Sequence, residues 1–146
     1  MESGEKLRRL NRLGEVKLLN LPKIEDPRGN LTFFEDSNQI PFKIERVFWT
    51  YDVPGGQTRG GHAYYEQDEL IIALSGSFDV VITKPNSGKE VFSLNRSYYG
   101  LYVPAQTWRH LENFSTNSLS LHASDMQFSE EDYIRDFNIY KSLHEQ

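Results

Sequence analysis

The sequence predicts an all-β fold, an antiparallel sandwich or barrel, with one short helix near its C-terminal end. Short runs rich in β-branched and aromatic residues recur about every ten residues, and turn signals containing Gly or Pro separate them. Phe, Tyr and Trp make up 13% of the 146 residues, which favours strands over a helical bundle. The middle of the chain has no segment of helix length with a 3.6-residue period. Regularly spaced short strands are typical of all-β sandwiches and barrels.

The expected elements follow one another along nearly the whole chain. Residues 1–15 are polar and lack a strand pattern, so we expect a tail there, followed by a single domain over residues 16–146. A helix is expected from about Ser129 to Ser142, because Ser129 is a suitable N-cap and carboxylates follow it directly. The expected strands are residues 16–21, 30–36, 43–53, 69–76, 77–84, 90–95, 99–104, 108–114 and 118–124, with a further strand through His62.

The composition excludes several classes of protein. There is no Cys, which removes disulfides, thiolate metal sites, Fe–S clusters and thiol nucleophiles. The apolar runs are too short for a membrane span or a signal peptide, so we expect a cytoplasmic protein without a membrane partner. The net charge of −5 disfavours a general nucleic-acid surface but is compatible with a local anion pocket.

The most informative segment is residues 59–76, which resembles the first metal-binding motif of the cupins. That motif has His-x-His, then a Glu a few residues on, and a Gly that ends a strand. His62, Glu69 and Gly76 match this pattern, and Tyr64 stands where the second His would be.

The second cupin motif is also altered at its ligand position. Pro104 and Asn113 match it, but Arg109 stands where the ligand His belongs. Arginine stays protonated and only donates hydrogen bonds, so it cannot bind a cation. Iron, manganese or zinc would need three good nitrogen or oxygen ligands. The sequence therefore predicts a cupin-like frame with no metal and no other cofactor.

The residues at these altered positions are suited to proton transfer. Alternation along a strand puts His62 and Tyr64 on one face, and Arg109 joins them if the second motif folds as in cupins. His is the side chain best placed to act as a general base near pH 7, whereas Tyr, with an ordinary pKa of about 10, mainly donates. Further candidate cations for a phosphate-bearing substrate are Arg28, Arg46 and Arg59.

Three aromatic residues are candidates for binding a nucleotide base: Trp108, Tyr99 and Tyr102. The sheet alone requires core or wall residues of this kind, and one of them could also supply the apolar slot for the base. Of the other histidines, His110 is expected on the opposite face, outside the site. His122 lies on a late strand, where its orientation stays open.

A more specific resemblance rests on six segments that follow one another from about Leu18 to Tyr140. They are DPRGNLTFFED, IPFKIERVFW, RGGHAYYEQDELIIALSGSFDVV, YYGLYVP, TWRHLENFS and EEDYIRDF. In these segments the sequence resembles the WxcM-like sugar-nucleotide 3,4-ketoisomerases, small metal-free RmlC-like cupins acting on dTDP-4-keto-6-deoxyglucose. The resemblance implies an RmlC-like jelly roll, a homodimer with exchanged N-terminal strands, a dTDP-linked 6-deoxy-4-ketohexose as substrate, and no metal.

The resemblance also implies roles for individual residues. In the family a pair of histidines moves protons between C3 and C4 of the hexose; the first falls at His62 and the second at Tyr64. Family members have His or Arg at the position of Arg109, and Arg or Tyr at that of Arg28. These two positions go with the stereochemistry of the product at C4. The chain mixes the two patterns, so the epimer formed stays open.

The leading prediction is a dTDP-4-keto-6-deoxyhexose 3,4-ketoisomerase of deoxysugar biosynthesis for surface polysaccharide, working by enolisation. His62 is the expected proton shuttle, Tyr64 its partner, and Arg109 steadies the oxyanion of the enediolate. The alternative is a non-catalytic sugar-nucleotide-binding or regulatory cupin, which Tyr64 in place of His favours. A 3,5-epimerase is a third possibility, but it requires a His–Asp base pair that the sequence does not reveal.

Overall fold

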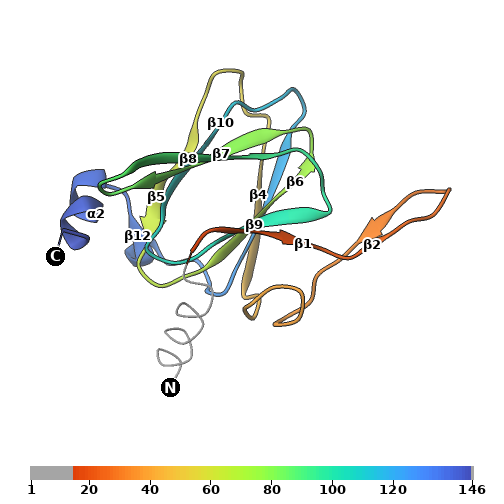
Figure 1. Cartoon of the computed structure of the whole chain (residues 1–146), viewed down its shortest axis with the longest axis horizontal. Helices are drawn as coiled ribbons and strands as arrows, with labels where there is room; N and C mark the ends of the chain where they lie inside the picture. The colour runs from red at the N-terminus through yellow and green to blue at the C-terminus, as the bar shows by residue number, and fades with distance from the viewer. Residues whose placement is uncertain (1–14, 146) are drawn as a thin grey trace.

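Two antiparallel five-stranded sheets face each other in the computed structural model, which describes residues 15–145 (Figure 1). The tail expected before residue 15 lies outside the described residues. In spatial order, the first sheet contains β1 (Lys17–Asn20), β9 (Tyr99–Val103), β6 (Glu69–Ser75), β11 (Leu119–Ser124) and β4 (Arg46–Tyr51). The second contains β12 (Tyr133–Ile134), β5 (Arg59–Tyr64), β10 (Trp108–Glu112), β7 (Phe78–Lys84) and β8 (Gly88–Leu94).

The space between the sheets has an apolar end and a polar end. On β6, Ile71 and Ala73 point inward into the main core, and the inward residue before them is the carboxylate Glu69. On β10, Leu111 belongs to the same core and the preceding inward residue is Arg109. Each strand therefore changes from core to polar residues along one face, which creates a site at one end. The core consists of Ile71, Ala73, Phe78, Val80, Ile82, Leu94, Leu101, Val103 and Leu111.

The outer faces of both sheets are covered in part. The loop before β4 places Ile40 and Phe42 against the outer face of the first sheet, where Tyr102 is buried among them. The C-terminal helix α2 (Phe137–Leu143) covers the outer face of the second sheet, where Tyr140 packs on Trp108. Aromatic residues of the sheets thus pack on the outer faces as well as in the core between the sheets.

The C-terminal helix begins later than the sequence predicted. Ser129 makes no side-chain capping bond, and only the short 3-10 helix η1 (Glu130–Asp132) follows it. β12 then pairs with β5, because the open edge of that sheet offers backbone partners that a local helix signal ignores. The N-cap of α2 is Asp136, whose carboxylate accepts hydrogen bonds from two backbone N–H groups. No helix within residues 15–145 is long and apolar enough to cross a membrane.

β5 carries a bulge in its pairing with β10. Arg109 pairs with His62, but two residues further along β10 Leu111 pairs with Arg59, three residues back on β5. The extra residue lies at Gly60 or its neighbour, and Gly60 has a φ of 73°, which a side chain would disfavour. Strict alternation would send Arg59 and His62 to opposite faces, so the bulge is what allows both to face inward.

A two-stranded arm leaves the barrel near the start of the chain. It consists of β2 (Lys23–Ile24) and β3 (Leu31–Thr32), and Figure 1 shows it projecting away from the two sheets. Ile24 and Leu31 are 55% and 56% exposed, so the arm presents apolar side chains to solvent. Arg28 lies in the turn at its tip.

Candidate active site

The polar end of the barrel encloses a cavity of about 640 Å³ between the two sheets. Its lining comes from β4, β5, β6, β10, β11 and β12 and from the segment before β12. The charged side chains in the lining are four arginines and a single carboxylate, although the whole chain has a net charge of −5. This local excess of positive charge suits an anionic ligand. The charged residues are Arg46, Arg59, Arg109, Arg135 and Glu69.

His62 lies at the centre of an aromatic cluster. Its ring centroid is 4.7 Å from that of Tyr64 and 4.9 Å from that of Tyr133. Its Nδ1 atom is buried and has no hydrogen-bond partner among the described residues. Burial, together with the nearby charge of Arg109, lowers the pKa of His62 to about 3. The imidazole is therefore neutral at pH 7 and free to accept a proton.

Glu69 connects the buried polar groups beneath His62. Its side chain is 2% exposed, and Arg109 donates a hydrogen bond from Nη2 to its Oε1 at 2.8 Å. On the other carboxylate oxygen, Oε2, the hydroxyl of Tyr64 lies at 3.5 Å and Nδ1 of His122 at 3.6 Å. Burial alone would raise the pKa of Glu69, but Arg109 and then His122 outweigh it and hold the pKa at about 2. Glu69 is thus an ionised counter-charge for Arg109.

Two positions of the cupin metal motif form an ion pair with each other. Arg109, which stands at the motif's ligand position in place of His, places its guanidinium on the carboxylate of Glu69. Within residues 15–145, no group of three His, Cys, Asp or Glu side chains is placed to hold a metal ion. That the protein works without a metal stays a prediction.

Tyr64 is completely buried. The guanidinium of Arg109 lies 4.4 Å from its ring centroid, and its hydroxyl faces the carboxylate of Glu69. Burial, and then the negative charge of Glu69, raises the pKa of Tyr64 well above its ordinary value. The phenol consequently stays protonated, so it can give up a proton but cannot act as a base.

The cavity residues missed by the sequence analysis include Tyr133 and Arg135. Tyr133 is the register partner of Tyr64 across the β12–β5 pair, and the two hydroxyls are 3.5 Å apart. Both residues belong to the segment assigned to a helix, where neither was expected in a cavity. The available signal was the stretch DYIR, which already carried part of the family resemblance.

His122, whose orientation the sequence left open, lines the cavity from β11. Its ring is stacked on Phe48 with centroids 4.5 Å apart, and its Nε2 is 2.9 Å from the hydroxyl of Ser120. His110 faces the outer side of β10, where its Nε2 contacts Glu112 at 2.6 Å. It does not line the cavity.

Of the three other predicted cations, two line the cavity and one does not. Arg46 lines the cavity, donates to the side-chain oxygen of Gln67 at 3.0 Å and lies 4.6 Å from the ring centroid of Phe48. Arg59 lines it too. Arg28 does not: it is exposed on the arm and forms two hydrogen bonds to the carboxylate of Asp26, at 3.0 and 3.1 Å.

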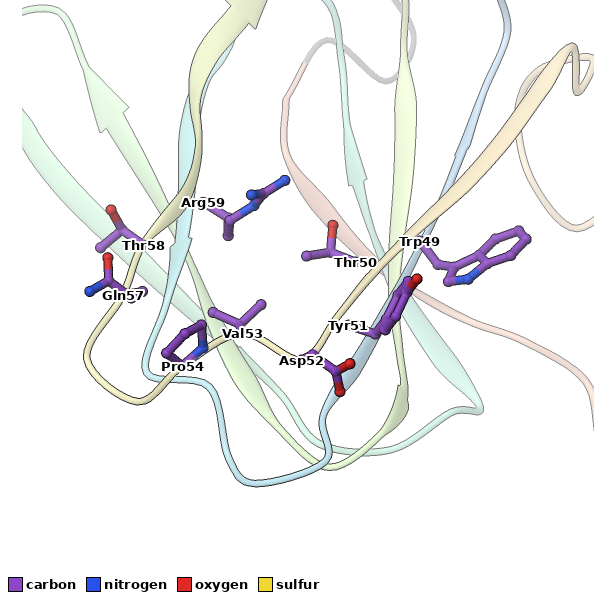
Figure 2. Close-up of a pocket in the computed structure, with 9 residues that line it drawn as sticks. All are labelled: Trp49, Thr50, Tyr51, Asp52, Val53, Pro54, Gln57, Thr58 and Arg59. Carbon is purple, nitrogen blue, oxygen red and sulfur yellow. The ribbon is translucent and has the colours of Figure 1, made fainter.

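A second pocket of about 460 Å³ adjoins the cavity under the β4–β5 loop (Figure 2). The two spaces share Trp49, Thr50, Thr58 and Arg59. Figure 2 shows the side chain of Arg59 extending from β5 toward Thr50 on β4. Arg59 thus stands where the two spaces meet.

The three aromatic candidates for base binding all lie outside the cavity. Trp108 packs under α2, and Tyr102 is buried on the outer face of the first sheet. Tyr99 packs against the main core, and its hydroxyl donates to the side chain of Asn95 at 2.8 Å. Trp108 is next to Arg109 in β10, so alternation turns it outward. In this chain the three side chains contribute to packing.

Comparison with known proteins gives a consistent result. The model of the family described as FdtA: WxcM-like, C-terminal, matches residues 14–145. A curated relative is the TDP-4-oxo-6-deoxy-alpha-D-glucose-3,4-oxoisomerase of Aneurinibacillus thermoaerophilus. It is 33% identical over 127 residues, which cover 87% of this chain and 91% of the relative.

Solved structures agree with the family match. The sugar 3,4-ketoisomerase QdtA from Thermoanaerobacterium thermosaccharolyticum, in complex with TDP, has a TM-score of 0.86 and 30% identity, covering 90% of this chain and 95% of that one. The TDP-quinovose 3,4-ketoisomerase WlaRB from Campylobacter jejuni has a TM-score of 0.82 and 32% identity, covering 87% and 97%. A dTDP-4-dehydrorhamnose 3,5-epimerase from Bacillus anthracis shares the fold, with a TM-score of 0.68, 18% identity and coverage of 81% and 76%. These matches confirm the predicted RmlC-like cupin jelly roll.

Proposed function

The chain belongs to the FdtA, WxcM-like family, and on this premise we propose how its cavity carries out the family's reaction. The protein is a sugar-nucleotide 3,4-ketoisomerase of deoxysugar biosynthesis, since its relatives at 30% identity and above are TDP-sugar 3,4-ketoisomerases. Its substrate is a TDP-linked 4-keto-6-deoxyhexose, and its product is the 3-keto isomer. The proposal also includes a single domain over residues 16–146 and a cytoplasmic location.

One observation carries the proposal: a neutral imidazole faces a cavity whose lining is rich in arginine. The diphosphate of a nucleotide sugar is an anion, and guanidinium groups bind phosphate oxygens in a fork of parallel hydrogen bonds. Arg59 is the best placed cation for this role, because it joins the two spaces and has no carboxylate partner within residues 15–145. The sugar would then lie over His62, with the nucleoside toward the adjoining pocket.

His62 is the general base in this proposal. Its neutral imidazole takes the C3 proton, an enediol forms, and the same proton or a solvent-derived one is returned at C4. A base with a lowered pKa accepts protons weakly, but a bound diphosphate adds negative charge near the ring and strengthens its affinity for a proton.

Arg109 is proposed to steady the enediolate oxyanion. Its Nη2 is engaged by Glu69 and its Nη1 by the backbone oxygen of Thr107 at 3.3 Å. A guanidinium carries five N–H donors, so some remain for the substrate. Because Glu69 offsets part of the charge, we expect a smaller contribution from Arg109 than an unpaired arginine would give.

The test is to mix the purified protein with TDP-4-keto-6-deoxyglucose in D₂O and follow the sugar ring by NMR. We expect the 3-keto sugar to form and the C3 proton to exchange with solvent, with no change in a sample without protein. A protein that binds TDP but catalyses no C3 exchange over hours would instead be the non-catalytic binding cupin. The sequence leaves the configuration at C4 of the product undecided, and the same spectra determine it.

We also propose the homodimer that the resemblance implied. A two-stranded arm is marginal by itself, and the apolar Ile24 and Leu31 on this arm are more than half exposed. A second copy packed against the arm would bury them and could bring Arg28 to the partner's cavity, since Arg28 does not line the cavity of its own chain. Light scattering is expected to give about twice the 17.0 kDa chain mass, and Leu31→Asp to shift it toward one chain. A wild-type mass of one chain at micromolar concentration would contradict the dimer.

A further inference from the structure

The isomerisation moves two protons, and the base His62 accounts for one of them. Converting a 4-keto sugar to a 3-keto sugar transfers hydrogen from C3 to C4, and also from the oxygen on C3 to the oxygen on C4. The second transfer needs a group that gives a proton to O4 and takes one from O3. This inference rests on the proposed function, because only that reaction requires both transfers.

We propose that Tyr133 is the catalytic residue on the oxygen side of the reaction. β12 pairs with β5, and this register puts the Tyr133 ring on the same face as Tyr64 and His62. Both tyrosines line the cavity, but Tyr133 is half-buried whereas Tyr64 is completely buried. A sugar lying over His62 therefore meets the hydroxyl of Tyr133 more readily than that of Tyr64.

Two arginines lie beside the Tyr133 side chain. Nη1 and Nη2 of Arg46 lie 3.5 and 3.4 Å from its hydroxyl oxygen, and the guanidinium of Arg135 lies 4.3 Å from its ring centroid. These separations are long for hydrogen bonds but close for charge stabilisation. A phenolate formed here would lie between two positive charges. Arg135 also forms an exposed ion pair with Glu130, at 2.6 Å.

Tyr64 also has arginines nearby, with Nη2 of Arg46 3.5 Å from its hydroxyl and the guanidinium of Arg109 4.4 Å from its ring centroid, but it differs from Tyr133 in having a carboxylate beside its hydroxyl. Its hydroxyl faces the Glu69 carboxylate at 3.5 Å, so ionising it would place a second negative charge beside the first in a buried position. Tyr133 makes no hydrogen bond to a carboxylate in the described part of the chain. The partner role that the sequence gave to Tyr64 therefore passes to Tyr133, and Tyr64 becomes a positioning residue whose hydroxyl lies 3.5 Å from that of Tyr133.

The two steps balance without any further reactant. As His62 takes the C3 proton, the C3–H electron pair forms the C3=C4 bond, the carbonyl π pair moves to O4, and O4 takes the proton of Tyr133. The tyrosinate then takes the proton of the hydroxyl on C3. That oxygen forms the new C3=O bond, the C3=C4 pair takes the proton from His62 at C4, and both side chains regain their starting states.

The variant Tyr133→Phe tests the proposal, because it removes the hydroxyl and keeps the ring that packs on His62. We expect kcat to fall roughly 10²–10⁴-fold, the usual range for one acid–base group, with little change in KM or in TDP binding. Tyr64→Phe should cost less in kcat than Tyr133→Phe. The matched control is Tyr65→Phe, since Tyr65 is exposed and does not line the cavity, and its activity should stay at the wild-type level.

Arg135→Gln provides a second readout that a structural role would not give. It removes the guanidinium that lies 4.3 Å from the Tyr133 ring centroid, so proton transfer through the Tyr133 oxygen loses charge stabilisation and kcat should fall with little change in KM. In a Tyr133→Phe background the same change should have little further effect, because no hydroxyl remains for Arg135 to stabilise.

The outcomes separate the two levels of the argument. An active wild type with Tyr133→Phe within threefold of it overturns this inference alone, as does a larger loss in Tyr64→Phe at equal thermal stability. A wild type that neither isomerises the sugar nor exchanges C3 overturns the proposed function as well. A larger loss in Tyr133→Phe than in Tyr64→Phe at equal thermal stability, with Arg135→Gln lowering kcat only where Tyr133 is present, supports Tyr133.

Discussion

The cavity has a floor and a rim that use the same residue types differently. On the floor, Glu69, Arg109 and Tyr64 are at most 2% exposed and contact one another. On the rim, Arg46 and Tyr133 are half-buried and Arg59 is exposed. The charges of the floor are largely balanced within the protein, whereas the positive charges of the rim are not.

This difference indicates a division of labour between stability and chemistry. Removing one member of a buried ion pair leaves its partner with an uncompensated charge, so changes to the floor should act on folding. Rim side chains keep donors and positive charge for the substrate, so changes there should act on binding or turnover. His62 lies between the two, with a buried Nδ1 and a position in the cavity lining. The following predictions test this division.

The largest effect is expected at His62. His62→Asn removes the proposed base, so exchange of C3 with deuterium should be abolished and turnover should fall roughly 10²–10⁴-fold. NMR in D₂O measures both. His110→Asn is the control, because that ring lies on the outer face of β10, and it should exchange at the wild-type rate. Exchange that persists in His62→Asn would assign the base elsewhere.

The next effect is on stability, from Glu69→Gln on the floor. Arg109 would be left buried without its counter-charge, which typically costs about 3–5 kcal/mol of the free energy of unfolding. Denaturant unfolding measures this loss. Glu66→Gln is the matched control, because that side chain is exposed and its loss should be close to neutral. Equal stability of the two variants would show that the floor ion pair does not stabilise the fold.

Lowering the pH should reduce the free energy of unfolding through His62 and Glu69. The folded-state pKa of His62 is about 3 against 6.5 ordinarily, and that of Glu69 about 2 against 4.5. Both are lowered, so the unfolded chain binds more protons and the free energy of unfolding falls with pH, from 6.5 toward 3 for His62 and from 4.5 toward 2 for Glu69. Denaturant unfolding across pH 7 to 3 measures this, and His62→Asn should flatten the upper part. A flat wild-type profile between pH 6.5 and 4.5 would contradict it.

A smaller effect is expected at the rim from Arg59→Gln. Losing one charged hydrogen-bond donor to the diphosphate should raise KM for the TDP-sugar about 10- to 100-fold, in keeping with about 1.5–3 kcal/mol per charged bond. The free energy of unfolding should stay within ~0.5 kcal/mol, as is usual at exposed positions. Steady-state kinetics and unfolding measure the two quantities. Lys84→Gln, at the far β7–β8 pair, is the control. A loss of stability without a rise in KM would show that Arg59 acts on folding, as the floor residues do, and not on substrate binding.

The smallest effect, none, is expected from removing metals. Arg109 and Tyr64 replace imidazoles of the cupin metal site, so dialysis against EDTA should leave turnover unchanged. Elemental analysis of protein purified without added metal supplies the second measurement. Stoichiometric iron, manganese, zinc or nickel, or an activity restored only by such an ion, would contradict the metal-free prediction.

The sequence predicted the sheets well because their signals are local. Alternation correctly put His62 and Tyr64 on one face, and the observed rings are 4.7 Å apart. The same rule that placed His110 outside the site also applies to Trp108, which was nevertheless kept as a binding candidate. Periodicity is thus sufficient to assign faces wherever a strand is regular.

The sequence could not predict contacts that depend on tertiary pairing. Ser129 and the carboxylates after it are good local helix signals, yet the open edge of β5 takes Tyr133 and Ile134 as a short strand instead. Backbone hydrogen bonds to an exposed sheet edge are invisible in a local pattern. Tyr133 therefore reached the cavity from a segment where no site residue was expected.

The bulge in β5 makes the charge of the cavity depend on the backbone conformation of one residue. Gly60 and Gly61 of β5 together oppose one residue of β10, and this mismatch turns Arg59 to the same side as His62. Straightening the strand at its present length, which a β-branched residue at Gly60 would favour, would restore regular alternation and point Arg59 out of the barrel. The cavity would lose one positive charge with no charged residue removed from the chain. Deleting Gly60 would instead leave Arg59 two residues from His62 and on the same face, so sequence changes here should be judged by their effect on the bulge as well as by residue type.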